Sequence, residues 1–163
     1  MPMNFSHLDA AGAAHMVDVG AKAVTSRQAR ARGRVRFPPE VYGALRASDG
    51  QTKKGAIFST AQLAGIMGAK QTANLIPLCH PLALEKVALD FRYDDDSCAV
   101  EILATCRVSG KTGVEMEALT AVSIAALTLY DMCKALSHDI VIENIQLDAK
   151  SGGKSEFVRE SHD

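Results

Sequence analysis

The chain has 163 residues, 47% of them hydrophobic and 23% charged, and its net charge is −1 at pH 7. A chain of this length buries roughly 70% of the surface that it exposes when unfolded, so it needs neither a disulfide nor a metal to fold. The balanced charge argues against a generic nucleic-acid binder, and the N-terminus lacks the basic flank and apolar core of a secretory signal. We expect one domain over residues 1–163, with flexible arms at 1–14 and 156–163.

The four cysteines form no C-x-x-C pair and lie in or beside apolar segments: Cys79, Cys98, Cys106 and Cys133. This pattern is typical of reduced, largely buried thiols and predicts a cytoplasmic protein.

The N-terminal quarter predicts one clear strand. Asp9–Gly12 has turn composition, and residues 15–19 alternate enough for a short strand. Over residues 29–37, small or apolar side chains alternate with arginines, and a strand segregates the two sets onto opposite faces. The arginines are Arg30, Arg32, Arg34 and Arg36. We interpret this arginine stripe as the solvated face of an antiparallel strand, and an anion-binding surface is the alternative.

Two helices are expected next. Pro38 and Pro39 end the strand and favour the first turn of a helix that continues to Arg46. After the Asp49-Gly50 turn, Lys53-Lys54-Gly55 precedes an amphipathic helix over residues 56–70. Paired lysines before a helix are usually solvated charges, although they can also approach an anionic ligand.

The loop over residues 74–82 is unusually apolar. Pro77 and Pro81 stiffen its backbone around Cys79 and His80. Because surface loops are normally polar, this loop must be covered by the fold, by another subunit or by a ligand.

The second half predicts a hairpin, a long helix and a strand. Residues 86–93 and 100–107 alternate on either side of a polar turn, and residues 140–147 form the last strand. Between them, residues 112–136 are expected to form a helix that is apolar nearly all round and is therefore buried. This helix is too short, and too rich in Thr and Ser, to span a membrane. Thr112 and Glu115 fit a capping box at its start. This order predicts an α+β fold, a ferredoxin-like antiparallel sheet with helices packed on one face.

Ionisable residues gather at the ends of these elements. Gly110-Lys111-Thr112 and Gly153-Lys154-Ser155 lack the upstream glycine of a phosphate-binding Walker loop, but both can bind anions. Glu115 and Glu117 begin the long helix, where the macrodipole alone favours them. Asp131 and Lys134 face each other at its end, either as a structural ion pair or as a tuned, partly desolvated acid–base pair. The lysines beside glycines or at element ends suit a highly anionic small molecule: Lys54, Lys111, Lys134, Lys150 and Lys154.

Four ordered motifs carry a family resemblance: Leu78-Cys79-His80-Pro81-Leu82, then residues 110–119, Tyr130-Asp131-Met132-Cys133-Lys134, and residues 149–155. With Ala11-Gly12 and residues 15–19, they make the chain similar over its whole length to the cyclic pyranopterin monophosphate synthases of molybdenum cofactor biosynthesis. The resemblance implies a ferredoxin-like subunit in a homohexamer, a trimer of dimers with active sites at the dimer interface. It also implies conversion of 3′,8-cyclo-7,8-dihydroguanosine triphosphate into cyclic pyranopterin monophosphate, with release of pyrophosphate.

The resemblance also implies residue roles. Asp131, Lys54 and Lys134 would be catalytic. Substrate would contact Leu78, Cys79, His80, Met116 and Glu117, and also Glu115, Lys150, Arg27 and Asp18. No cofactor or metal site is required, and Mg²⁺ is an optional companion of the triphosphate. No nucleic acid or membrane partner is expected.

Two departures from the family pattern concern Glu156, where the family often has glycine, and the arginine stripe, which is not part of the pattern. The alternatives are a non-catalytic ferredoxin-like module that binds a nucleotide, and nucleic-acid binding through the stripe, which lacks an aromatic platform. Because the ends of a straight helix of this length lie about 20 Å apart, we expect its two ends to serve one substrate only from different subunits.

Overall fold

A five-stranded antiparallel sheet of order β4-β5-β1-β6-β7 organises the computed structural model, which describes residues 5–53 and 55–160. The strands are β1 (Thr25–Arg36), β4 (Lys86–Asp94), β5 (Ala99–Gly110), β6 (Val141–Ser151) and β7 (Phe157–Val158), and β2 (Gln51–Thr52) pairs separately with β3 (Gly55–Ala56). The helices are α1 (Pro39–Ala47), α2 (Ile57–Lys70), α3 (Thr72–Leu75) and α4 (Glu115–Cys133).

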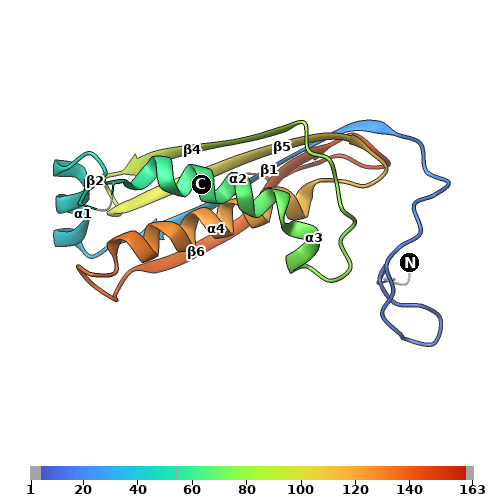
Figure 1. Cartoon of the computed structure of the whole chain (residues 1–163), viewed down its shortest axis with the longest axis horizontal. Helices are drawn as coiled ribbons and strands as arrows, with labels where there is room; N and C mark the ends of the chain where they lie inside the picture. Colours follow the sequence, from blue (N-terminus) through green and yellow to red (C-terminus); the bar gives the residue numbers. More distant parts are fainter. Residues whose placement is uncertain (1–4, 54, 161–163) are drawn as a thin grey trace.

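The order of the main elements is that of a ferredoxin-like fold. Strand β1 leads through α2 to the β4–β5 hairpin, and α4 then leads to β6, which returns to the free side of β1. Helices α2 and α4 lie side by side on one face of the sheet (Figure 1). The predicted α+β, ferredoxin-like class is therefore confirmed.

The core lies between α4 and the three central strands. Ala29 and Ala31 on β1 pair with Cys106 and Ala104 on β5, and all four side chains are buried toward the helices. Helix α4 contributes a fully buried set of mostly small residues: Ala118, Ala121, Val122, Ala125, Ala126 and Leu129. Small side chains let the helix lie close to the sheet, and the long helix predicted to be buried is the central core helix.

The arginine stripe faces away from the helices and is matched by carboxylates. Arg32 pairs with Asp148 at 2.9 Å. Arg34 lies 2.9 Å from Asp94 and 3.4 Å from Glu143, which also lies 3.4 Å from Arg36. These pairs balance the charges of Arg32, Arg34 and Arg36 within the chain, which supports the interpretation of the stripe as a solvated face.

Helix α1 is held at the far end of the sheet by a polar and aromatic cluster. Arg46 donates two hydrogen bonds of 2.9 Å to the carboxylate of Asp95, and the Tyr42 hydroxyl donates a third at 2.6 Å. The Arg46 guanidinium also lies over the Tyr93 ring, 4.4 Å from its centroid. This cluster ties α1 to the turn of the β4–β5 hairpin. Helix α1 is followed by the predicted Asp49-Gly50 turn, where both residues have positive φ.

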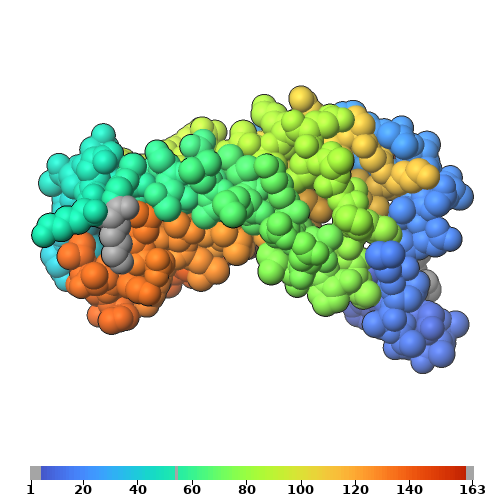
Figure 2. All heavy atoms as spheres, in the orientation of Figure 1, coloured from blue at the N-terminus to red at the C-terminus, as the bar shows by residue number. Residues whose placement is uncertain are grey.

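Two local predictions are wrong. Residues 15–19 form no strand in the described structure, and the N-terminal segment to which they belong lies at the end of the molecule opposite α1 (Figure 2). The capping box does not form: Val114 is the N-cap residue without a side-chain cap, and Thr112 lies in the preceding loop. The Glu115 carboxylate instead pairs with Lys150 at 3.1 Å, so it is not available to cap the helix. By contrast, the Asp9–Gly12 turn is confirmed by a 3.0 Å backbone hydrogen bond from Gly12 to Asp9.

Within the described residues, α4 is the one helix long and apolar enough to cross a membrane by length and composition. It is also the helix that packs on β1, β5, β6 and α2, and the core helix of a soluble protein passes the same test. The predicted C-terminal arm includes β7, which pairs with β6 through Ala149 and Lys150.

The close contact between α2 and α4 can be tested at Gly65. A Cβ atom there would lie 2.5 Å from Leu89 Cδ2 and 2.9 Å from the Ala121 carbonyl oxygen, so Gly65→Ala overpacks the interface. We expect its free energy of unfolding to fall by about 1–3 kcal/mol in urea titrations at fixed protein concentration. Gly43 in α1 is the matched control, since a Cβ there meets nothing within 4 Å. Gly43→Ala should stabilise the protein by about 0.5–1 kcal/mol, and equal effects of the two substitutions would contradict the packing argument.

Candidate functional site

A cleft of about 830 Å³ opens at the end of the molecule away from α1. Antiparallel pairing creates it: the start of β1 pairs with the ends of its two neighbours, as in Thr25 with Gly110 and Gln28 with Ser151. Helix α4 begins five residues after β5 ends, so its N-terminus lies at the same edge. The N-terminal segment and the loop after α3 complete the walls.

The cleft brings together the residues predicted to contact substrate. Its lining includes Arg27, Leu78, Cys79, His80, Glu115, Met116, Glu117 and Lys150. They come from β1, the loop after α3, the start of α4 and β6. Asp18 is exposed and does not line the cleft. Lys54 lies outside the described residues.

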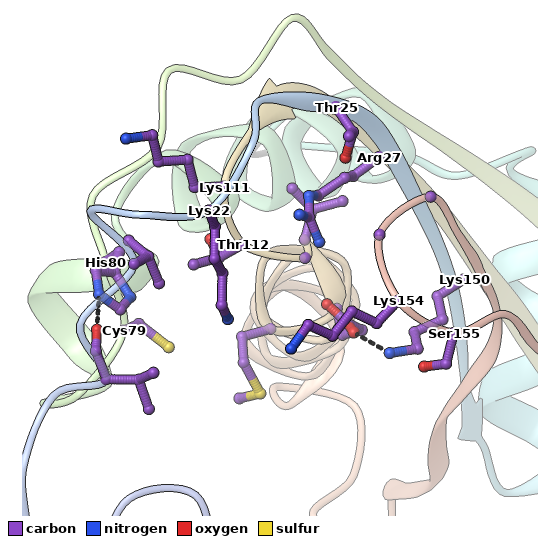
Figure 3. Close-up of a pocket in the computed structure, with 18 of the residues that line it drawn as sticks. Lys22, Thr25, Arg27, Cys79, His80, Lys111, Thr112, Lys150, Lys154 and Ser155 are labelled. Atoms are coloured by element: carbon purple, nitrogen blue, oxygen red, sulfur yellow. Dashed lines mark hydrogen bonds and ion pairs between the residues drawn. The ribbon is translucent and has the colours of Figure 1, made fainter.

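A pair of glycines leaves room for one basic residue of the cleft, Arg27. Gly152 and Gly153 have φ values of +84° and +78°, and a Cβ on Gly153 would lie 2.3 Å from a terminal guanidinium nitrogen of Arg27. Arg27 therefore packs against this turn, and its Nε donates a 3.0 Å hydrogen bond to the Gly110 carbonyl. Lys150 forms its 3.1 Å ion pair with Glu115 across the cleft (Figure 3).

Glu117 is a buried carboxyl group at the base of the cleft. Its side chain is 4% exposed, and burial raises its pKa from 4.5 to about 7, with the neighbouring Glu115 charge adding to the rise. A carboxyl group with this pKa can hold or release a proton near neutral pH. Burial and the Glu117 charge also raise the pKa of Cys79 and that of Cys106, the latter to about 12. Both cysteines are therefore neutral thiols rather than thiolate nucleophiles.

His80 uses one ring nitrogen to hold the N-terminal segment. Its Nε2 lies 2.7 Å from the Val17 carbonyl oxygen. Because a carbonyl only accepts, Nε2 must carry the hydrogen, and in the neutral ring Nδ1 is then an acceptor. The constrained loop thus anchors its histidine in a defined orientation, with Cys79 beside it (Figure 3).

Asp131 and Lys134 lie at the opposite end of α4, outside the cleft. Lys134 Nζ is 2.7 Å from the Asp131 carboxylate, which confirms the predicted i,i+3 pair. The two side chains are 49% and 63% exposed, so the expectation of partial desolvation is wrong. The hydrogen bond that Lys134 donates to Asp131, and then the Asp131 charge, raise the pKa of Lys134. At 1.5 Å per residue, the pair lies roughly 23–27 Å along the helix axis from Met116.

Sequence reasoning missed residues of the cleft that stand in no motif. Lys22 and Thr25 line it, and the Thr25 hydroxyl is buried without a hydrogen-bond partner in the described structure. The sequence marks Lys111 and Lys154 as cations at element ends but gives neither an individual role. No motif marks Lys22, and only its place in a turn, with its N–H donating to Val19 at 3.0 Å, hints at a fixed position.

The fold and cleft define a ferredoxin-like protein with a cleft lined by several basic side chains. The MoaC family model matches residues 16–153, so the chain belongs to the MoaC family. It therefore has a role in molybdenum cofactor biosynthesis, within a family of soluble biosynthetic enzymes that act on small molecules. The family resemblance found in the sequence motifs is confirmed.

The raised pKa of Glu117 predicts a pH-dependent stability. Between pH 4.5 and about 7 the folded state retains a proton that the unfolded state has released, so the free energy of unfolding falls as the pH rises. The loss should total about 3 kcal/mol and be complete above that window. Urea unfolding at low and high pH should show this loss in the wild type relative to Glu117→Gln, which has no titrating carboxyl group. Parallel pH profiles of the two proteins would contradict the assignment.

Proposed function

We propose that this protein is a cyclic pyranopterin monophosphate synthase, a lyase that converts 3′,8-cyclo-7,8-dihydroguanosine 5′-triphosphate into cyclic pyranopterin monophosphate and pyrophosphate. The proposal rests on one observation. In this MoaC-family chain, a single cleft is lined by all five residues of the two stretches that the family resemblance implies in substrate contact: Leu78, Cys79, His80, Met116 and Glu117. A volume of about 830 Å³ lies in the range of small-molecule sites.

The two sides of the cleft suit the two parts of such a substrate. The first side contains Cys79, Met116 and Glu117, which carries no charge when it is protonated. This weakly polar wall suits the ring system of the substrate. Lysines line the other side, together with Arg27 and the hydroxyl groups of Thr112 and Ser155. A triphosphate of about −4 charge is stabilised most where several cations converge, because no single cation balances it.

A second subunit would complete the active site. Asp131 and Lys134 belong to the far end of α4, too distant for one copy of the chain to bring them to its own cleft. In the proposed homohexamer, a trimer of dimers, the Asp131–Lys134 pair of one subunit faces the cleft of its partner. Isologous pairing would then give each dimer two equivalent sites.

The proposed chemistry has two stages. Ring rearrangement needs proton transfers, which we assign to Lys54, Lys134 and Asp131. A ribose hydroxyl group then attacks the α-phosphorus, and the bond to pyrophosphate breaks. The Asp131 carboxylate raises the pKa of Lys134 and so keeps its side chain protonated, and it also holds the ammonium group in place. Mg²⁺, where present, would bind through the triphosphate oxygens.

Loss of the Lys134 ammonium group should abolish turnover without unfolding the protein. We expect Lys134→Ala to reduce pyrophosphate release from the cyclic dihydro-GTP substrate by at least about a hundredfold, the usual contribution of a positioned acid or base. Lys54→Ala should behave in the same way. Lys70→Ala, at the exposed end of α2, is the control and should retain wild-type turnover. Near-normal product formation by both active-site variants would refute the assignment.

A shared site predicts complementation between inactive subunits. When Lys134→Ala and the cleft variant His80→Ala are unfolded, mixed and refolded together, half of the dimers should be mixed, each with one intact site. Turnover should then recover to about a quarter of the wild-type value. Each variant refolded alone is the control. Mixtures that stay as inactive as the separate variants would show that both residues serve the same subunit.

A further inference from the structure

We propose that the N-terminal arm, residues 5–16, docks on a second copy of this chain, where the Phe5 ring fills an apolar pocket between α1 and the end of α4. The proposal rests on the shared-site dimer of the proposed function and goes beyond it, because it gives the arm a place in the assembly. The MoaC family match begins at residue 16, so family membership assigns the arm no role.

The arm is a turn that makes its hydrogen bonds within itself. The Asp9 carboxylate accepts from the backbone N–H groups of Ala11 and Ala13 at 2.9 and 2.8 Å. Within the described structure, residues 5–16 form no hydrogen bond with the body of the protein. Figure 1 shows the arm extending away from the sheet and the helices, at the end opposite α1. The arm therefore has a defined shape that its own subunit does not use.

The arm exposes apolar side chains. Every residue from 5 to 16 is exposed, and Asp9 is the one residue among them with a permanent charge at neutral pH. The Phe5 side chain is 77% exposed, more than any other large apolar side chain in the described structure, and Leu8 and Met16 are exposed as well. Because projecting surface segments are normally polar, three large apolar side chains gathered on this one indicate that another surface covers it.

The pocket that we assign to Phe5 lies at the other end of the molecule. Its volume is about 220 Å³, and its walls come from α1, the start of α2, the end of α4 and the residues just after α4. Among the described residues, no charged side chain lines it. Because an apolar cavity of about 150 Å³ can hold benzene, this pocket has room for a phenyl ring. Most of the lining is apolar, including Val41, Leu45, Ile57, Met132, Cys133 and Leu136.

The shared-site dimer brings the arm and the pocket together. Met132 lines the pocket and directly follows Asp131, so the pocket and the Asp131–Lys134 pair share one end of α4. Ser6 and His7 line the cleft, so the arm and the cleft share the other end. When the pair of one subunit faces the cleft of its partner, the partner's arm lies beside the pocket. One copy cannot make this contact with itself, because the arm and α1 lie at opposite ends of the molecule (Figure 2).

Docking of the arm would help to align the two halves of each shared site. Removing the Phe5 ring and the pocket walls from water favours association through the hydrophobic effect. In an isologous dimer the contact forms twice, once for each arm. Because the arm lines one cleft and also binds the partner's end of α4, it sets how that cleft meets the Asp131–Lys134 pair.

A disulfide bond between subunits tests the contact directly. Phe5→Cys and Leu136→Cys, combined in one chain, should give covalent dimers under mild oxidation, since Leu136 lines the pocket and is 64% exposed. Peptide mapping should place the bond between residue 5 and residue 136 or the neighbouring Cys133. Phe5→Cys with Met67→Cys, an equally exposed position on α2, is the matched control and should not cross-link. No bond from residue 5 to the pocket, or equal yields from the two pairs, overturns the proposal.

Filling the pocket from within should displace the arm. Ala44 lines the pocket and is exposed, so Ala44→Leu adds volume there without replacing a core residue. Phe5→Ala and Ala44→Leu should each raise the Kd for dissociation of the assembly at least about tenfold, as for loss of a buried phenyl ring, in sedimentation over a dilution series. Together they should do little more than either alone, because both remove one contact. Val158→Ala, an exposed apolar position on β7, is the control and should leave the Kd unchanged. Additive effects, or an unchanged Kd for Phe5→Ala, overturn the proposal.

The tests separate this inference from the proposed function. Cross-linking and sedimentation require no turnover, so the docking of the arm stands or falls even if the protein does not convert the cyclic dihydro-GTP substrate. Restored turnover in the mixed dimers, with no bond from residue 5 to the pocket, would leave the shared site intact and refute the docking. A chain that stays monomeric would refute both the docking and the shared site.

Discussion

The packing of α4 against the centre of the sheet is the constraint on which the structure depends. Its buried face consists mostly of alanine, and two glycines, Gly33 on β1 and Gly65 on α2, leave room for Val122 and the Ala121 carbonyl. These close contacts hold α4 against the sheet on one side and against α2 on the other. Because the helix is held along its length, the acidic residues at its start and the Asp131–Lys134 pair at its end are presented at fixed places on opposite ends of one rigid element.

The sequence predicted the fold well where periodicity and burial agree. The arginine stripe revealed β1, alternation revealed the β4–β5 hairpin, and an all-round apolar run revealed α4. The failures have local causes. Residues 15–19 alternate like a strand, but a strand needs a neighbouring edge, and that information lies in the tertiary structure. The capping box failed because Glu115 has a stronger partner in Lys150, a residue 35 positions away in the chain.

The candidate site was predictable to the extent that motifs carry it. The residues of the Leu78–His80 and Met116-Glu117 stretches were found from the resemblance, and the structure collects them in one cleft. Lys22 and Thr25 were missed because they stand in no motif and gain their place only through contacts with distant loops. The buried state of Glu117 was also not visible, since a glutamate in the first turn of a helix is ordinarily solvated.

The arginine stripe has a consequence for how the sheet assembles. Strand β1 is the central strand of the sheet, and it pairs with both β5 and β6. A shift of β1 by one residue would turn four guanidinium groups into the core and expose the alanines and Val35 that belong there. It would also break the pairs of Arg32 with Asp148 and of Arg34 with Asp94. Sheets in which β1 is shifted by one residue are therefore strongly disfavoured. The arginine stripe thus helps to specify the register of β1 relative to its two neighbouring strands.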